Sequence, residues 1–125
     1  MIKNIVDYLE ITERKYGSKM AYCDENREIT FSGLKESALA IAGGLLDHVR
    51  IGTPVLVYMN KSVEVIEAFL GVAYTGSFYV PIDIQMPYER VKLIIDTLGA
   101  KTLLARRGDE IPEAVKKDCT VFYIE

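Results

Sequence analysis

The sequence predicts a layered α/β fold with a mostly parallel sheet, flanking helices and a small N-terminal hairpin. Short apolar runs typical of strands alternate with longer segments whose apolar residues recur every three or four positions, which is the pattern of βαβ units. The run at 55–59 is apolar without alternation, as expected for a parallel strand covered on both faces. A polar turn at 24–27 separates two short β-rich runs and indicates the hairpin.

The N-terminal segment predicts a helix that leads into this hairpin. Asn4 can cap the helix and Gly17 can end it. The two hairpin strands are expected at 20–23 and 28–30. The pair is expected at the edge of the fold.

The clearest helix begins after Thr30, which is a good N-cap residue. Its apolar residues form one continuous face at helical spacing: Phe31, Leu34, Ala38, Ile41 and Leu45. Gly43 and Gly44 lie inside this helix, where each costs roughly 1 kcal/mol relative to Ala. We interpret them as a place where the helix packs closely on a neighbour, with a bend as the alternative.

The rest of the chain continues the alternation of strand and helix. Ser62 can cap a helix that ends at Gly76, Pro87 can take the first position of the next helix, and Gly99 can end that helix. Strands are expected at 55–59, 78–82, 102–105 and 120–124, and a weak short helix at 111–117. The last strand lacks a loop beyond its carboxyl end, where open α/β sheets bind ligands. This indicates a fragment of a larger domain.

Length and composition indicate one globular domain over residues 1–125. The formal charge of −3 is unlike the basic footprint of nucleic-acid-binding proteins, and the apolar runs are too short for a membrane span. The N-terminus lacks the apolar stretch of a signal peptide. Cys23 and Cys119 lie far apart without a C-x-x-C motif, so we expect buried free thiols and a cytoplasmic protein.

The residues themselves assign no catalytic, nucleotide-binding or metal-binding site. The chain has neither a G-x-x-x-x-G-K-[ST] loop nor a G-x-G-x-x-G turn after a strand. Gly76 follows a predicted helix, whereas a phosphate-binding turn precedes one. His48 is the only histidine and has no identifiable Ser or Cys partner. No spacing supplies the three or four ligands that a metal site needs.

A phosphoacceptor receiver domain is an alternative on the same architecture. Asp24 and Glu25 resemble its acidic pair and Asp83 its acceptor, but the lysine expected after the last strand is missing. An unrelated flavodoxin-like domain is a further alternative.

Arg90 lies in the first turn of its predicted helix, where the helix dipole disfavours a cation. Asp83, across the preceding turn, is a candidate anionic partner. We therefore predict an Asp83–Arg90 interaction that fixes the strand-to-helix connection. The alternative is an arginine exposed on the surface.

Two segments resemble the first two core motifs of the adenylate-forming (AMP-binding) superfamily, in the right order. The matching residues are Thr30, Phe31 and Leu34 in the first, and Gly76, Tyr79, Val80, Pro81, Asp83, Pro87 and Arg90 in the second. The Tyr-Val-Pro-Ile-Asp run at 79–83 is similar to the amino-acid-activating branch of the family. That branch comprises nonribosomal peptide synthetase adenylation domains and D-alanine-activating ligases.

The chain departs from the family pattern at several positions of these motifs. Tyr74 and Thr75 stand where Lys and Ala are usual, Ile84 replaces a proline, and Gly33 replaces an acidic residue. These differences weaken the resemblance to the branch more than the resemblance to the family.

The resemblance implies an ATP-dependent reaction with Mg²⁺, in which a carboxylate becomes an acyl-adenylate and then passes to the phosphopantetheine thiol of a carrier protein. The nucleotide-binding motifs of the family have no match in this chain. The resemblance therefore implies structural roles for the matched residues and no catalytic role.

We expect an N-terminal fragment of such a ligase that is inactive by itself. A non-catalytic interaction module is the alternative. A reading frame that continues past Glu125 into a Ser/Thr/Gly-rich loop ending in Pro-Lys-Gly would favour the fragment. A fragment should expose apolar surface and form a homo-oligomer. The residues identify neither the amino acid nor the choice between synthetase and D-alanine ligase.

Overall fold

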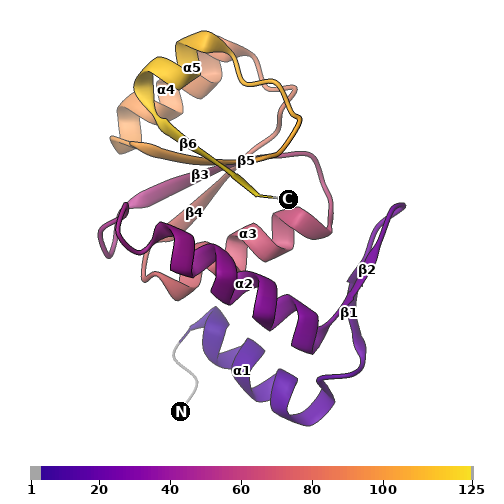
Figure 1. Cartoon of the computed structure of the whole chain (residues 1–125). Helices are drawn as coiled ribbons and strands as arrows, with labels where there is room; N and C mark the ends of the chain where they lie inside the picture. Colours follow the sequence, from indigo (N-terminus) through magenta and orange to yellow (C-terminus); the bar gives the residue numbers. More distant parts are fainter. Residues whose placement is uncertain (1–3, 125) are drawn as a thin grey trace.

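The computed structural model describes residues 4–124, so the expectations for the first three residues and for Glu125 lie outside it. Its helices and strands alternate along the chain (Figure 1). They are α1 Ile5–Tyr16, β1 Met20–Cys23, β2 Glu28–Thr30, α2 Phe31–Leu45, β3 Pro54–Tyr58, α3 Val63–Tyr74, β4 Phe78–Ile82, α4 Tyr88–Leu98, β5 Thr102–Arg106, α5 Glu113–Asp118 and β6 Thr120–Ile124.

The central sheet has four strands in the order β4-β3-β5-β6, and every pairing in it is parallel. The separate antiparallel pair β1-β2 forms the N-terminal hairpin. The predicted fold class is therefore confirmed, including the mostly parallel sheet and the hairpin.

Helices cover both faces of the sheet. On one face Leu56 and Leu103 pack with Val91 of α4 and Val115 of α5. On the other face a second cluster joins the sheet to α2 and α3: Leu45, Val55, Val57, Met59, Ala68, Val72 and Leu104. The predicted unbroken apolar run of β3 follows from this arrangement, because both of its faces are buried.

The N-terminal segment forms an additional layer that packs on α3. Its core joins α1, α2 and α3 through Leu9, Leu34, Ala38, Val63 and Leu70. Polar contacts link the same helices: the Tyr74 hydroxyl donates to Glu10 Oε1 at 2.7 Å, and Lys35 Nζ lies 2.8 Å from Glu10 Oε2. Burial and the Glu10 carboxylate both raise the pKa of Tyr74, so its hydroxyl remains a donor.

The predicted N-caps are confirmed for three helices. Asn4 Oδ1 accepts hydrogen bonds from Val6 N and Asp7 N, Thr30 Oγ1 accepts from Gly33 N, and Ser62 Oγ accepts from Val65 N. These side chains satisfy amide groups that have no partner within the helix.

Two predicted helix starts are wrong by one or two residues. Pro87 precedes α4 and is itself extended, with ψ 141°. The helix predicted from 111 begins at Glu113, after an extended Pro112. A residue before proline is disfavoured in the α conformation, which keeps Ile111 out of α5.

The interpretation of Gly43 and Gly44 as a close-packing site is wrong. Both are exposed, and a Cβ atom added to either would have nothing within 4 Å. The close approach of α2 and α3 occurs instead at Gly71, where an added Cβ would lie 2.6 Å from Ile41 Cγ2 and 3.2 Å from Ala38 O.

The two cysteines are free, but only one is buried as predicted. Cys119 is buried, and its burial raises the pKa of the thiol. Cys23 is exposed because it lies on β1, whose residues are mostly exposed. In the described part of the chain, no helix has the length and apolar character required to cross a membrane.

Candidate functional site

The first motif lies at the start of α2. Thr30 caps the helix through its side-chain oxygen. Phe31 is half-buried, and Leu34 is 1% exposed in the core shared with α1 and α3. This motif therefore begins the helix that holds the N-terminal layer on the sheet.

The second motif forms edge strand β4 and the connection to α4. Gly76 follows α3 with a φ of +81°, a conformation that favours glycine. Tyr79 and Val80 pair with Val55 and Leu56 of β3. Pro81 lies in this edge strand, where a missing N–H group is tolerated.

The predicted Asp83–Arg90 interaction is not formed. Asp83 Oδ1 instead accepts a hydrogen bond of 2.8 Å from Gln85 N, and Met86 N donates to the Asp83 carbonyl oxygen at 2.9 Å. Arg90 is exposed, and none of the ion pairs among residues 4–124 includes it. The turn is therefore held by hydrogen bonds within residues 83–86. Arg90 is a surface arginine, as the alternative interpretation expected.

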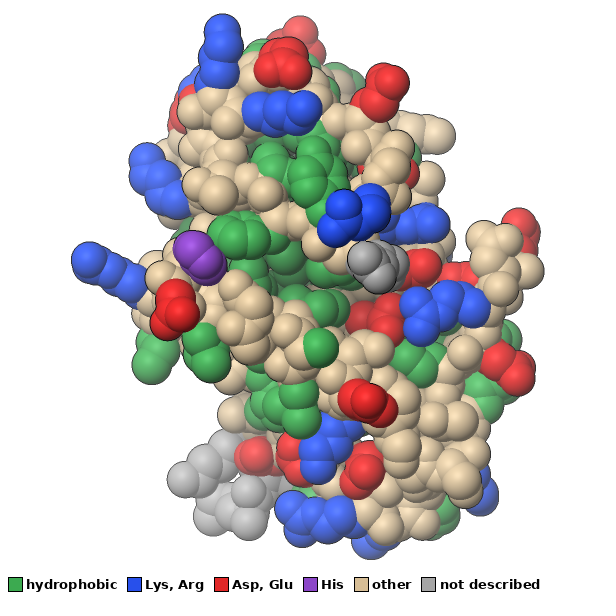
Figure 2. Space-filling model, in the orientation of Figure 1, with side chains coloured by type: hydrophobic (Ala, Val, Ile, Leu, Met, Phe, Trp, Pro, Cys, Tyr) green, Lys and Arg blue, Asp and Glu red, His purple; other side chains and the backbone are tan. Residues whose placement is uncertain are grey.

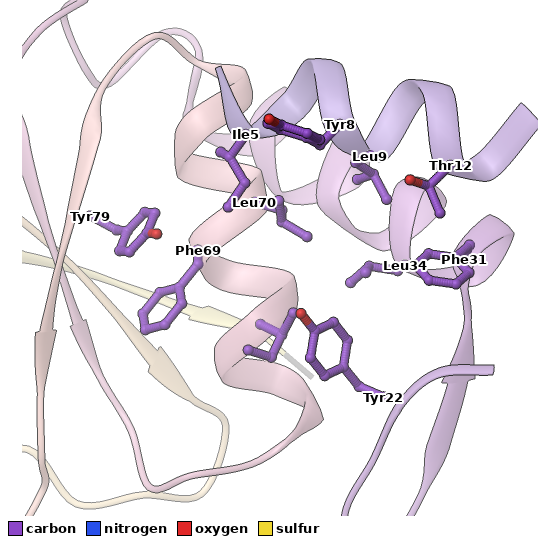
Figure 3. Close-up of a pocket in the computed structure, with 11 residues that line it drawn as sticks. Ile5, Tyr8, Leu9, Thr12, Tyr22, Phe31, Leu34, Phe69, Leu70 and Tyr79 are labelled. Carbon is purple, nitrogen blue, oxygen red and sulfur yellow. The ribbon is translucent and has the colours of Figure 1, made fainter. Parts of the chain in front are cut away.

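The two motifs meet at one apolar cavity of about 340 Å³ (Figure 3). Phe31 and Leu34 line it from the first motif, and Tyr79 lines it from the second. Tyr79 stacks on Phe69 of α3 with ring centroids 4.2 Å apart and an interplanar angle of 13°. The sequence did not predict this cavity, because its walls come from segments that are distant along the chain.

This cavity is suited to apolar contact and carries no acid, base or nucleophile pair. Its polar groups are the hydroxyls of Thr12, Tyr8, Tyr22 and Tyr79, and no charged side chain is among the described residues that line it. The arrangement can bind or pack apolar groups, but it supplies no proton-transfer chemistry.

A second cavity of about 520 Å³ lies at the carboxyl ends of β3 and β4. Met59, Pro81 and Met86 contribute apolar walls, and Lys61 and Asp83 contribute opposite charges. Nearby, the Tyr58 hydroxyl donates to the Ile84 carbonyl oxygen at 3.2 Å. Burial, with a smaller contribution from Asp83, raises the pKa of Tyr58.

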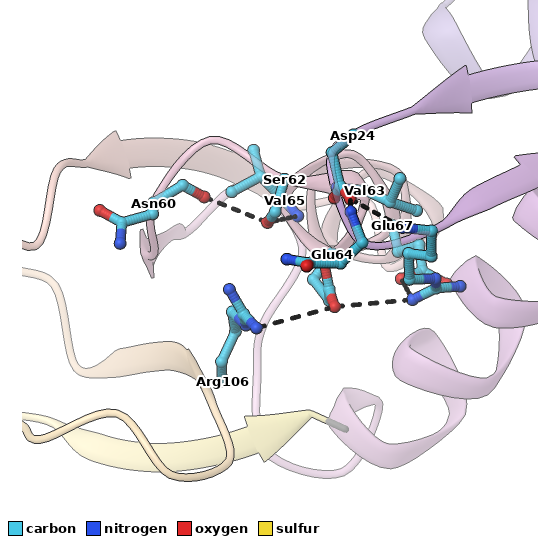
Figure 4. A network of polar contacts seen from close by, with 10 residues as sticks. Asp24, Asn60, Ser62, Val63, Glu64, Val65, Glu67 and Arg106 are labelled. Atoms are coloured by element: carbon cyan, nitrogen blue, oxygen red, sulfur yellow. Dashed lines mark hydrogen bonds and ion pairs between the residues drawn. The ribbon is translucent and has the colours of Figure 1, made fainter.

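The topological switch point of the sheet lies between β3 and β5. These neighbouring strands lead to α3 and α5, which pack on opposite faces, and such points commonly bind ligands. Here Ser62 Oγ donates to Asn60 O at 3.1 Å, and Arg106 lies 4.0 Å from Glu64 of α3 (Figure 4).

The hairpin supplies its own anion to the N-terminus of α3. Asp24 Oδ2 accepts a hydrogen bond of 2.7 Å from Val63 N, and Arg27 contacts Glu67 at 2.9 and 3.3 Å. The backbone N–H groups of Val63, Asn26 and Arg27 all donate to the Asp24 carboxylate. These hydrogen bonds, above all that from Val63, lower the pKa of Asp24. A carboxylate of the protein itself therefore occupies the N-terminus of α3, a position that commonly attracts anions.

The receiver-domain alternative is not favoured by this arrangement. Asp24 and Glu25 lie in the turn of an antiparallel hairpin and not after a parallel strand. Asp24 acts as a cap for α3, so the resemblance to an acidic pair is coincidental.

The remaining candidate groups are dispersed. His48 is exposed, and its ring lies 4.9 Å from that of Phe122. Within residues 4–124, no three His, Cys, Asp or Glu side chains are grouped so that they could hold a metal ion.

Comparison with known proteins agrees with the motif resemblance. The family model described as AMP-binding enzyme matches residues 9–124. D-alanine--D-alanyl carrier protein ligase of Lacticaseibacillus rhamnosus is 29% identical over 104 residues, which cover 83% of this chain and 21% of that protein. The chain thus spans about a fifth of the length of this relative.

Solved structures show the same fold. The N-terminal subdomain of Klebsiella oxytoca NpsA matches 98% of this chain and 35% of its own, with a TM-score of 0.78 and 21% identity. The nonribosomal peptide synthetase FmoA3, in its α-methyl-L-serine-AMP bound form, matches 92% of this chain and 13% of its own, with a TM-score of 0.80 and 26% identity.

Proposed function

Because the chain belongs to the AMP-binding enzyme family, we propose that residues 1–125 form the N-terminal part of an amino-acid-activating, adenylate-forming ligase. In this reaction a carboxylate oxygen attacks the α-phosphate of ATP, which gives an acyl-adenylate and releases pyrophosphate. The acyl group then passes to the phosphopantetheine thiol of a carrier protein, and AMP leaves.

This proposal rests on the observation that residues of both motifs line the same cavity. Phe31, Leu34 and Tyr79 line the same cavity although they are far apart in the sequence. The names of the relatives support the choice of substrate, since one is a D-alanine carrier protein ligase and another binds an amino-acid adenylate. We propose that the motif residues are architectural.

The described residues do not fit ATP or Mg²⁺. At the N-terminus of α3, Val63 N is bonded to Asp24 and Val65 N to Ser62. Among residues 4–124, the glycine turn that comes between a strand and a helix is at Gly108, and residues 109–112 separate it from α5, unlike a phosphate-binding loop. We therefore assign nucleotide and metal binding to other parts of the longer ligase, and a cytoplasmic location in keeping with the free cysteines.

The first test is amino-acid-dependent exchange of labelled pyrophosphate into ATP by the 125-residue chain alone. We expect no exchange above the blank for any amino acid. Exchange above the blank would contradict the assignment of nucleotide binding to other parts of the ligase.

The second test transplants residues 9–124 into the matching segment of the Lacticaseibacillus rhamnosus ligase. We expect the chimera to retain D-alanine-dependent exchange, because the segment supplies architecture. A control chimera with Leu34→Ala should have a free energy of unfolding that is lower by about 2–5 kcal/mol. A chimera that folds with native stability but gives no exchange would contradict the proposal that this segment can replace the N-terminal part of the ligase.

A further inference from the structure

The two edges of the central sheet present different backbone groups. Among the described residues, β4 pairs only with β3, and β6 pairs only with β5. Unpaired N–H and C=O groups on a sheet edge can bind another strand. An edge can therefore bind another strand only if its outward backbone groups include both N–H donors and C=O acceptors.

On β6, the outward groups belong to Val121 and Tyr123. Thr120 N donates to Lys101 O, and Ile124 O accepts from Arg107 N, both at 2.8 Å. Backbone groups of alternate residues in a strand point to the same neighbour. Thr120, Phe122 and Ile124 are therefore bonded to β5, and the N–H and C=O of the two residues between them face away from the sheet.

On β4, the same reasoning gives an edge that lacks a donor. Phe78 N donates to Thr53 O at 3.1 Å, and Ile82 O accepts from Met59 N at 3.2 Å. The outward residues are therefore Tyr79 and Pro81. Because proline has no N–H, this edge cannot complete a regular ladder with another strand.

We propose that β6 pairs antiparallel with β6 of a second copy of this chain, about a two-fold axis at Phe122. In this register Val121 lies opposite Tyr123 of the second copy, and Tyr123 lies opposite its Val121. Each such pair exchanges both of its N–H···O=C bonds, so every outward backbone group of the two residues is satisfied. The register is self-complementary, as a two-fold interface requires.

The side chains around β6 favour this pairing. The strand contains no proline or charged residue between Thr120 and Ile124, although such residues commonly protect natural edges. Tyr123 is 40% exposed. Figure 1 shows β6 in front of the other strands, and Figure 2 shows hydrophobic side chains in the middle of the same face.

A groove beside β6 leaves room for the second copy. It has a volume of about 270 Å³ and is lined by Ile41, Gly44 and Leu45 of α2 together with Phe122 and Ile124. Gly44 has open space where a side chain would be. Opposed Phe122 rings would lie on this face of the sheet, where the groove can receive them.

The pairing is tested by Tyr123→Pro, with Tyr123→Val as the matched control. Proline removes one outward N–H without removing a bond to β5, as Pro81 does naturally in β4. We expect sedimentation velocity to show a concentration-dependent dimer for the unmodified chain and for Tyr123→Val, and a monomer for Tyr123→Pro. A monomer at every concentration for the unmodified chain, or a persistent dimer of a folded Tyr123→Pro, would overturn the proposal.

Amide hydrogen exchange of the unmodified chain provides a readout that needs no variant. The Val121 and Tyr123 amides should exchange several-fold more slowly as concentration rises, whereas the Phe122 amide is protected at all concentrations. A dimer with unprotected Val121 and Tyr123 amides would place the interface elsewhere. The result is independent of the ligase proposal, since pyrophosphate exchange does not report on β6.

Discussion

At the residue scale, Gly71 shows how a single missing side chain sets the distance between two helices. Its position on α3 faces Ile41 and Ala38 of α2. Gly43 lies on α2 itself but faces open space. A methyl group therefore has no room at Gly71, whereas it has open space at Gly43.

We predict that Gly71→Ala lowers the free energy of unfolding by about 1–3 kcal/mol, because the added methyl overlaps Ile41 and the Ala38 carbonyl oxygen. The matched control Gly43→Ala should raise it by roughly 0.5–1 kcal/mol, since alanine is favoured over glycine inside a helix. Urea unfolding followed by circular dichroism measures both. Equal effects of the two substitutions would contradict the packing explanation.

Tyr74 gives a physical reason for one departure from the family motif. A lysine is usual at this position, whereas the Tyr74 hydroxyl donates to Glu10, which also binds Lys35. Tyr74 thus joins α1 to α3, and Lys35 of α2 contacts the same carboxylate.

At the scale of elements, the hairpin and α3 are held together by Asp24. Its carboxylate accepts hydrogen bonds from Val63 N, Asn26 N and Arg27 N. Arg27 of the same turn contacts Glu67, which is buried on α3. The joint therefore depends on a charged carboxylate at a helix N-terminus, where the helix dipole favours it.

We predict that the stabilisation from Asp24 disappears in acid. Because its pKa is lowered on folding, the stabilisation is fully present above its ordinary value of 3.8 and is lost as pH falls through the lower pKa of the folded protein. The stability difference between the unmodified chain and Asp24→Asn should therefore be largest near neutral pH and shrink below that value. Urea titrations over this pH range measure it.

Glu25→Gln is the control for the acid prediction, because it removes the same charge from an exposed neighbouring residue. Its effect on stability should be smaller at neutral pH than that of Asp24→Asn. A difference for Asp24→Asn that does not change with pH would show that its charge does not hold the joint.

At the scale of the whole molecule, the layers differ in how completely they are buried. Val55, Leu56 and Leu103 in the central strands are 0% exposed, whereas most residues of β1 are exposed. Local opening is easiest where few apolar contacts resist it. We predict that backbone amides of β3 and β5 exchange slowest and those of the hairpin fastest, as measured by NMR at low protein concentration. Faster exchange in β3 than in the hairpin would contradict this order.

Local patterns were sufficient for most elements. Caps at Asn4, Thr30 and Ser62 and the unbroken apolar run of β3 were predicted because each depends on residues that are adjacent in the chain or on burial of both faces of one strand. Predictions of helix starts failed because a proline can either be the first residue of a helix or lie just before it. Pro87 fits the first position of a helix, but it took the extended position just before α4. The helix predicted from 111 likewise begins only after an extended Pro112.

The sequence by itself determined the α/β class, the alternation of elements and the two family motifs, because periodicity, capping and glycine or proline positions act over a few residues. Only the tertiary structure decided that the motifs share a cavity, that Asp24 caps α3, and that Gly71 and not Gly43 is the contact between helices. It also decided that Asp83 accepts from Gln85 N and forms no ion pair with Arg90. These features depend on the strand order and on the angles between helices. Both arise from many weak long-range contacts that no local segment encodes.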